Sequence, residues 1–195
     1  RPAIHALLPK ADHVLVGGAM AYTFLKALGQ NVGASRVEED MVAEAKTIID
    51  EAARLATDMH LPVDHICSTE FSATSGDIDQ FEDGIKDGFM GLDIGLKTQG
   101  LFAGIISKSK TIVWNGPMGV FEWGPFAVGT KSIARAMSNA AEKGATAIVG
   151  GGDSAAAVER FGMVDKMTHV STGGGASVAM LEGKAFEAVD LLDNA

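Results

Sequence analysis

Three short apolar segments of the sequence run directly into turns that are rich in glycine. The turns are Gly17-Gly18, Gly150-Gly151-Gly152-Asp153-Ser154 and Thr172-Gly173-Gly174-Gly175, and a segment of helical character follows each one. Glycine lets backbone N–H groups approach phosphate oxygens, and a helix N-terminus carries roughly half a positive elementary charge. These turns could bind phosphate without basic side chains, although plain tight connections between strand and helix also use glycine.

Two acidic residues stand where they could complete a nucleotide site. Asp153 follows the glycines at a predicted helix start, where it is either an N-cap or a carboxylate ligand to Mg²⁺ shared with phosphates. Glu122 ends the stretch WNGPMGVFE at 114–122, which leaves a predicted strand through a rigid turn. Its carboxylate could accept hydrogen bonds from two ribose hydroxyls, or it could be a surface glutamate.

The remaining motifs give weak or negative indications of function. Residues 124–131 have the spacing of a P-loop, but the last two residues are in the wrong order. A Gly-x-Gly-x-x-Gly fingerprint is absent, which counts against the alternative of an NAD-dependent oxidoreductase domain. The five histidines show no metal-ligand spacing among themselves or with Cys67, and we expect them in the core or on the surface: His5, His13, His60, His65 and His169.

The elements that must position these turns alternate along the chain. Strands are predicted at 13–16, 62–66, 90–95, 111–114, 146–149 and 169–171, and helices at 3–9, 20–28, 38–57, 100–109, 130–142 and 154–161. The alternation predicts the α/β class, as a three-layer Rossmann-like parallel sheet with helices on both faces. Because the carboxyl ends of parallel strands share one edge, the three turns should converge there.

Two segments lie outside this alternation. Residues 72–88 are polar and rich in Gly and Asp, which predicts a loop or edge hairpin without chemistry. Residues 185–195 are expected to form a loosely attached tail.

Composition limits the class of protein. The 195 residues are 47% hydrophobic with 24 glycines and show no linker or repeat, so residues 1–195 are read as one domain. The net charge is −9, and no run of Lys and Arg could neutralise nucleic acid or a membrane surface, so neither is expected as a partner. A single cysteine and the lack of any membrane-length apolar stretch favour a soluble, cytoplasmic protein.

Six segments in series resemble the phosphoglycerate kinase family, and the resemblance covers almost the whole chain. The segments are HVLVGGAMAYTFLKA (13–27), LPVD (61–64), GFMGLDIGLKT (88–98), TIVWNGPMGVFE (111–122), IVGGGDS (148–154) and HVSTGGGAS (169–177). Members of this family are two-lobed enzymes that transfer a phosphoryl group between 1,3-bisphosphoglycerate and ADP with Mg²⁺, and they are expected to be monomers. The match is to the C-terminal lobe, which binds ADP or ATP.

The resemblance implies a role for each site residue. Gly18, Gly91, Leu92 and Pro117 should line the adenine slot, and Glu122 should hold the ribose. Asp153 should bind Mg²⁺, with Gly151, Gly152 and Ser154 around the phosphates and Asn115 nearby. The backbone N–H groups of Gly173 and Gly174, together with Gly151, should stabilise the transferring phosphoryl group.

The sequence departs from the family pattern in two ways. Ala19, Phe89 and Leu96 stand where family members often have glycine, tryptophan and proline, and these changes should affect packing more than chemistry. The family's Gly-Gly-x-Lys motif, its neighbouring lysines and the lobe that holds phosphoglycerate have no counterpart in these residues. The resemblance therefore implies nucleotide binding without turnover, and a free-standing, non-catalytic nucleotide-binding module remains the alternative.

Overall fold

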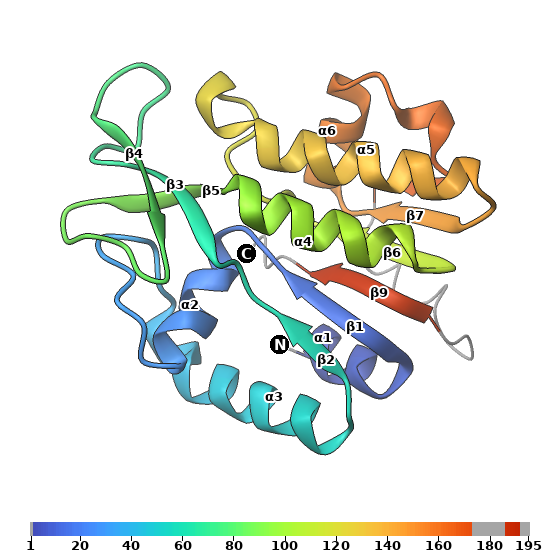
Figure 1. The fold of residues 1–195 in the computed structure, drawn as a ribbon, viewed down its shortest axis with the longest axis horizontal. Coiled ribbons are helices and arrows are strands. Elements are labelled where there is room, and N and C mark those ends of the chain that lie inside the picture. The colour runs from blue at the N-terminus through green and yellow to red at the C-terminus, as the bar shows by residue number, and fades with distance from the viewer. Residues whose placement is uncertain (1, 173–185, 192–195) are drawn as a thin grey trace.

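A six-stranded parallel sheet, the main sheet, forms the centre of the molecule (Figure 1). The computed structural model describes residues 2–172 and 186–191. In spatial order the main sheet contains β2 (Asp58–His60), β1 (Ala11–Val16), β9 (Phe186–Leu191), β6 (Thr111–Asn115), β7 (Thr146–Gly150) and β8 (His169–Ser171). Every pairing in it is parallel, which confirms the predicted α/β class.

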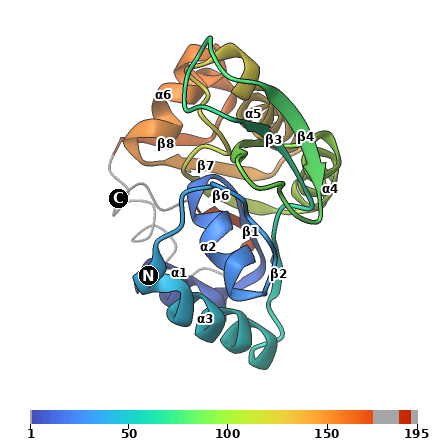
Figure 2. The ribbon, with the colours of Figure 1, turned by 90° about the vertical axis from the view of Figure 1, so that its left-hand side faces the viewer.

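Helices cover both faces of the main sheet, so the three-layer arrangement is also confirmed (Figure 2). The helices are α1 (Pro2–Leu7), α2 (Ala19–Ala27), α3 (Val42–Arg54), α4 (Leu96–Ser107), α5 (Val128–Glu142) and α6 (Gly152–Arg160). Short 3-10 turns occupy Leu8–Lys10, Glu39–Met41, Gly124–Phe126 and Val164–Lys166. Within the described chain, no helix is long and apolar enough to span a membrane.

The strands alternate their apolar side chains between the two faces. Val14 and Val16 pack with α1, α2 and α3, whereas Leu15 packs with α4 and α5 on the opposite face. Trp114 of β6 belongs to this second layer and is fully buried. Because successive side chains of a strand point to opposite faces, a strand buried on both sides must be apolar throughout. This requirement explains the continuous apolar runs from which the strands were predicted.

The C-terminal segment contradicts the prediction of a loose tail at 185–195. Residues Phe186–Leu191 form β9, which lies between β1 and β6 in the middle of the main sheet. Val189 pairs in register with Val14 on one side and Val113 on the other. The sequence FEAVDL contains two acidic residues, so it lacks the continuous apolar character of a central strand. The position of β9 in the main sheet is therefore set by its pairing with β1 and β6 rather than by an apolar composition.

A second, antiparallel sheet of three strands corrects another prediction. It has the order β4 (Ile78–Glu82), β3 (Asp64–Ser68) and β5 (Met90–Ile94). The segment 90–95 was expected to belong to the parallel sheet, but it pairs with β3 instead, with an irregularity between Ile66 and Cys67. The strand β4 falls within the polar excursion 72–88 and forms the edge hairpin expected there. This small sheet packs on the side of α2 that the main sheet leaves uncovered (Figure 1).

A buried carboxylate fixes the junction between the small sheet and α4. Asp64 of β3 accepts hydrogen bonds from the backbone N–H groups of Lys97 and Thr98 at 2.9 Å each and from the Thr98 hydroxyl at 2.5 Å. The first N–H groups of a helix lack partners within the helix, and a side-chain oxygen can supply one. Asp64 therefore caps α4 from a neighbouring strand and anchors the loop that leads from β5.

Candidate functional site

Two of the three glycine turns expected to converge, those after β1 and β7, lie at the carboxyl edge of the main sheet together with the turn after β6. Residues 173–175 of the third turn fall outside the described residues. Asn115 at the end of β6 pairs with Gly150 at the end of β7, and Gly150 pairs with Ser171 of β8. The Ser154 hydroxyl accepts a hydrogen bond from the backbone N–H of Gly116, which joins the β6 and β7 turns directly. The turns after β6 and β7 are therefore in direct contact.

Two glycines at this edge adopt backbone conformations that other residues rarely reach. Gly18 is the N-cap of α2 with φ of 69°, and Gly151 is the N-cap of α6 with φ of 93°. Such positive φ values favour glycine because it lacks a Cβ. Each of these turns therefore directs a helix N-terminus, with its unpaired N–H groups, toward the same edge of the sheet.

An apolar pocket of about 500 Å³ lies beside the turn after β1. Gly18, Gly91, Leu92 and Pro117, the four residues predicted to line an adenine slot, all line it. The remaining lining residues are Ala19, Tyr22, Ala34, Arg36, Phe71, Met90, Met118, Gly119 and Val120. Its size and mostly apolar walls are typical of a site for a small organic ligand with a flat ring.

Close packing requires several glycines around this pocket. A Cβ on Gly91 would overlap the ring end of Tyr22, a buried side chain of α2. A Cβ on Gly17 would overlap the sulfur of Met118, so the turns after β1 and β6 touch where Met118 forms the pocket wall. These glycines allow α2, β5 and the 117–120 turn to approach closely enough to enclose the pocket.

The turn after β7 has a different character from the pocket glycines. Among the described residues, the nearest atom that a Cβ on Gly152 would meet is the carbonyl oxygen of Thr172 at 3.9 Å. Asp153, in the first turn of α6, is exposed, whereas Ser154 is fully buried and bonded to Gly116. A helix N-terminus with an exposed carboxylate in its first turn can accommodate a phosphate and its cation.

Eight predicted site residues lie outside the pocket lining or outside the described chain. They are Gly151, Gly152, Asp153 and Ser154 of the turn after β7, and Asn115, Glu122, Gly173 and Gly174. Glu122 is exposed, and its backbone carbonyl accepts a hydrogen bond from Arg160 at 3.3 Å. Asn115 lies at the end of β6 beside the β7 turn. Neither is among the described residues that line the pocket. Gly173 and Gly174 fall outside the described residues.

Sequence reasoning missed several residues of the pocket. Phe71 lines it from the loop after β3, is 64% exposed, and packs edge-on against Trp123 with ring centroids 4.7 Å apart. Arg36 also lines it, from the connection between α2 and α3. The sequence offered only two weak signals for these pocket residues. They were an aromatic residue beside a polar loop and a lone cation in an acidic segment. Neither pattern indicates a position in space without the tertiary fold.

Burial changes the acidity of groups behind the pocket. Burial raises the pKa of Asp93 to about 7, although its carboxylate accepts hydrogen bonds from the backbone N–H groups of Gly129 and Ile94 that act in the opposite direction. Burial also raises the pKa of Tyr22 well above its usual value, with smaller contributions from Cys67 and Asp93. Tyr22 therefore presents a neutral phenol to the pocket.

An open parallel sheet whose glycine turns meet beside an apolar pocket is an α/β arrangement, the class in which ligands commonly bind at the carboxyl edge of the strands. The family model described as phosphoglycerate kinase matches residues 2–184. The chain therefore belongs to the phosphoglycerate kinase family. This membership gives no support to the oxidoreductase alternative.

Curated relatives agree with this assignment. The chain is 53% identical over 190 residues to phosphoglycerate kinase from Thermosipho africanus, covering 96% of this chain and 47% of the relative. It is 51% identical to phosphoglycerate kinase from Clostridium novyi, with 98% and 47% covered. The chain thus spans about half the length of the curated relatives that it matches.

Solved structures show the same fold. A phosphoglycerate kinase from Coxiella burnetii superposes with a TM-score of 0.86 at 38% identity, covering 93% of this chain and 46% of that one. A phosphoglycerate kinase from Pyrococcus horikoshii gives a TM-score of 0.76 at 32% identity, with 93% and 45% covered. Both similarities confirm the α/β fold with a parallel sheet flanked by helices.

Proposed function

We propose that this chain is the C-terminal, adenine-nucleotide-binding domain of a phosphoglycerate kinase. The whole enzyme would transfer a phosphoryl group between 1,3-bisphosphoglycerate and ADP, giving 3-phosphoglycerate and ATP in glycolysis. The observation that carries the proposal is the apolar pocket of about 500 Å³ lined by Gly18, Gly91, Leu92 and Pro117, at the edge where the glycine turns meet. A purine base is flat and largely apolar, and such a pocket suits it.

The turn after β7 would hold the phosphates. The lack of close contacts between a Gly152 Cβ and the described residues, and the positive φ of Gly151, support a close approach of phosphate oxygens to backbone N–H groups. Asp153 would be the carboxylate ligand of a Mg²⁺ ion that also binds the nucleotide phosphates, since Mg²⁺ in such sites takes one or two carboxylates. Ser154, held by Gly116, would fix the turn, and Asn115 would lie beside it.

The remaining roles complete the proposed site. Glu122 would accept hydrogen bonds from the ribose hydroxyls, which requires its exposed side chain to turn toward the pocket. Gly173 and Gly174, with Gly151, would donate backbone N–H groups to the transferring phosphoryl group. Catalysis of this transfer depends on positioning and charge stabilisation rather than on covalent chemistry by the protein.

The 195 residues alone would bind Mg-ADP or Mg-ATP without turnover. Phosphoglycerate would bind through a second domain of the whole enzyme, which would act as a cytoplasmic monomer without nucleic-acid or membrane partners. Loss of acceptor positioning removes a large part of any rate enhancement. The alternative is a free-standing nucleotide-binding module, which would bind the same nucleotides without being part of a larger enzyme.

Calorimetric titration with ADP, in Mg²⁺ and in EDTA, tests the proposal. The variant Asp153→Ala should weaken binding about tenfold or more in Mg²⁺, because a charge-assisted contact contributes about 1.5–3 kcal/mol. In EDTA its effect should be small. Equal weakening under both conditions would exclude Asp153 as the metal ligand, and no ADP binding by the unmodified chain would overturn the function.

A matched control is available on the same helix. Glu159 is an exposed carboxylate near the opposite end of α6, so Glu159→Ala removes the same charge far from the proposed phosphate position. Its ADP affinity should equal that of the unmodified chain in Mg²⁺. A coupled assay with 1,3-bisphosphoglycerate should detect no ATP formation, and measurable turnover would contradict the proposed need for a second domain.

A further inference from the structure

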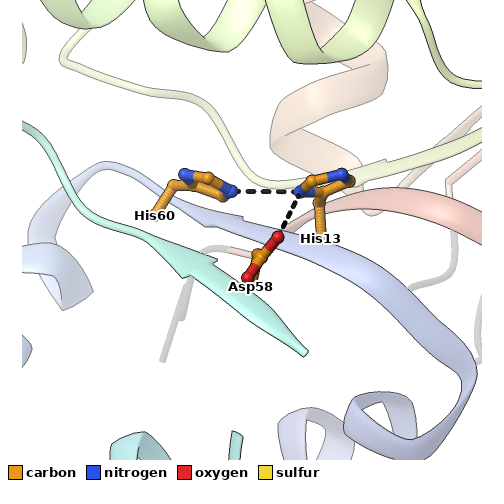
Figure 3. Close-up of side chains that lie close together, drawn as sticks. All are labelled: His13, Asp58 and His60. Atoms are coloured by element: carbon orange, nitrogen blue, oxygen red, sulfur yellow. Dashed lines mark hydrogen bonds and ion pairs between the residues drawn. The ribbon is translucent and has the colours of Figure 1, made fainter. Parts of the chain in front are cut away.

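Two histidines and an aspartate meet on the edge of the main sheet, away from the nucleotide pocket (Figure 3). The Nδ1 atom of His13 lies 3.1 Å from Nε2 of His60 and 3.8 Å from Oδ2 of Asp58. All three ligand atoms lie within 4.8 Å of one another. Among the described residues, this is the one group of three or more His, Cys, Asp or Glu side chains close enough to share a metal ion.

Strand pairing explains why the three side chains meet. His13 of β1 is in register with Asp58 of β2, and Leu15 is in register with His60. In a parallel pair, residues in register and those two positions along the strand share one face of the sheet. His13, Asp58 and His60 therefore stand together on the face that carries Leu15. Spacing along the chain, on which the sequence prediction for the histidines rested, gives no sign of this group, because strand pairing brings its members together.

The separations suit a tetrahedral transition-metal site. With metal–nitrogen and metal–oxygen distances of about 2.0–2.2 Å, two ligands of a tetrahedral ion lie about 3.3–3.5 Å apart. The observed 3.1 Å and 3.8 Å fall on either side of this range. Small shifts of these side chains would bring the two His13 separations to the tetrahedral range, and all three ligand atoms already lie within 4.8 Å of one another.

Chemistry and access also favour a metal of the zinc class. Two imidazoles and one carboxylate are ligands that suit Zn²⁺, Ni²⁺ and Cu²⁺ rather than Mg²⁺ or Ca²⁺. The side chains of His13 and Asp58 are 33% and 72% exposed, which lets an ion and a water ligand enter.

We propose that His13, Asp58 and His60 form a binding site for a zinc-class divalent ion that joins β2, at the sheet edge, to β1. The site is independent of the proposed nucleotide function. His13 lies four residues before Gly17, so the site is about 13 Å along the extended strand from the glycine turn beside the pocket. A bound ion would connect residues 47 positions apart in sequence and would stabilise the folded chain by mass action.

The test is a Zn²⁺ titration of chelator-treated chain, measured by competition with a chromophoric chelator, together with the visible absorption of the Co²⁺ form. The unmodified chain should bind one Zn²⁺ and give the intense Co²⁺ absorption of a tetrahedral site. His13→Gln and His60→Gln should each weaken Zn²⁺ binding by about tenfold or more and abolish that absorption. Zn²⁺ should raise the thermal midpoint of the unmodified chain but not of these variants.

His5→Gln is the matched control. The Nε2 atom of His5 lies 3.3 Å from Glu44, which is a second histidine–carboxylate pair but lacks another imidazole. This variant should keep full Zn²⁺ affinity, and Mg²⁺ should not compete. The proposal is overturned if His5→Gln weakens binding as much as His60→Gln, or if His13→Gln and His60→Gln bind Zn²⁺ as tightly as the unmodified chain. The histidine pair would then be a hydrogen bond only.

Discussion

The two halves of the proposed nucleotide site use glycine for opposite reasons. Around the pocket, Gly91 has no side chain because Tyr22 already occupies the space. At the turn after β7, the nearest atom of the described residues that a Cβ on Gly152 would meet is the Thr172 carbonyl oxygen, at 3.9 Å. Packing against the described residues thus accounts for the first glycine but not for the second. A glycine that the fold does not require is the stronger indication of a ligand.

The largest expected effect comes from Gly91→Ala. Its methyl would overlap Tyr22, whose ring is buried between α2 and the small sheet, and such overpacking costs about 1–3 kcal/mol of stability. Urea unfolding should show a lower midpoint with an unchanged slope. Gly104→Ala, in α4 with nothing within 4 Å, is the control and should leave stability equal or higher. Equal stability of the two variants would refute the packing account of Gly91.

Gly152→Ala should separate binding from stability. The residue begins α6 without a positive φ, so alanine should leave the unfolding midpoint unchanged or slightly raised. The added methyl would stand where a phosphate approaches, and loss of one hydrogen bond to a charged group costs about 1.5–3 kcal/mol. ADP affinity by calorimetry should therefore fall about tenfold or more. Unchanged affinity would remove the phosphate assignment from this turn.

The smallest expected effect is the pH dependence of stability, because two buried groups oppose each other. Asp93 has its pKa raised from 3.8 to about 7 by burial, so the folded chain retains a proton that the unfolded chain releases. Its contribution to stability therefore decreases as pH rises between these values. His65 has its pKa lowered from 6.5 to about 4 by burial, so its contribution decreases as pH falls across that window.

Single substitutions should reveal the two opposed slopes. Between pH 4 and 6.5, the stability of Asp93→Asn should rise with pH, since only the His65 contribution remains. The stability of His65→Gln should fall with pH over the same range, and the unmodified chain should lie between them. Urea midpoints measured at half-unit pH steps provide the check. Parallel profiles for all three proteins would show that these groups do not control the pH response.

Much of the fold and part of the site could be predicted from local sequence. The runs at 13–16, 111–114 and 146–149 are strands because burial on both faces demands continuous apolar residues. A family pattern grouped Gly18, Gly91, Leu92 and Pro117, and the structure places all four in the lining of one pocket; their role in binding adenine stays a prediction. The pocket residues Phe71 and Arg36 were missed, since loop residues reach a pocket by long-range folding that leaves no local pattern.

The sequence by itself determined the α/β class, the glycine turns and the helices, because periodicity and glycine content act over a few neighbouring residues. Only the tertiary structure decided which strands pair. It placed the acidic segment of β9 in the centre of the main sheet and moved β5 into the antiparallel sheet. It also brought His13 and His60 within 3.1 Å across 47 positions. Strand pairing depends on partners distant in the chain, and a short strand does not encode its partner.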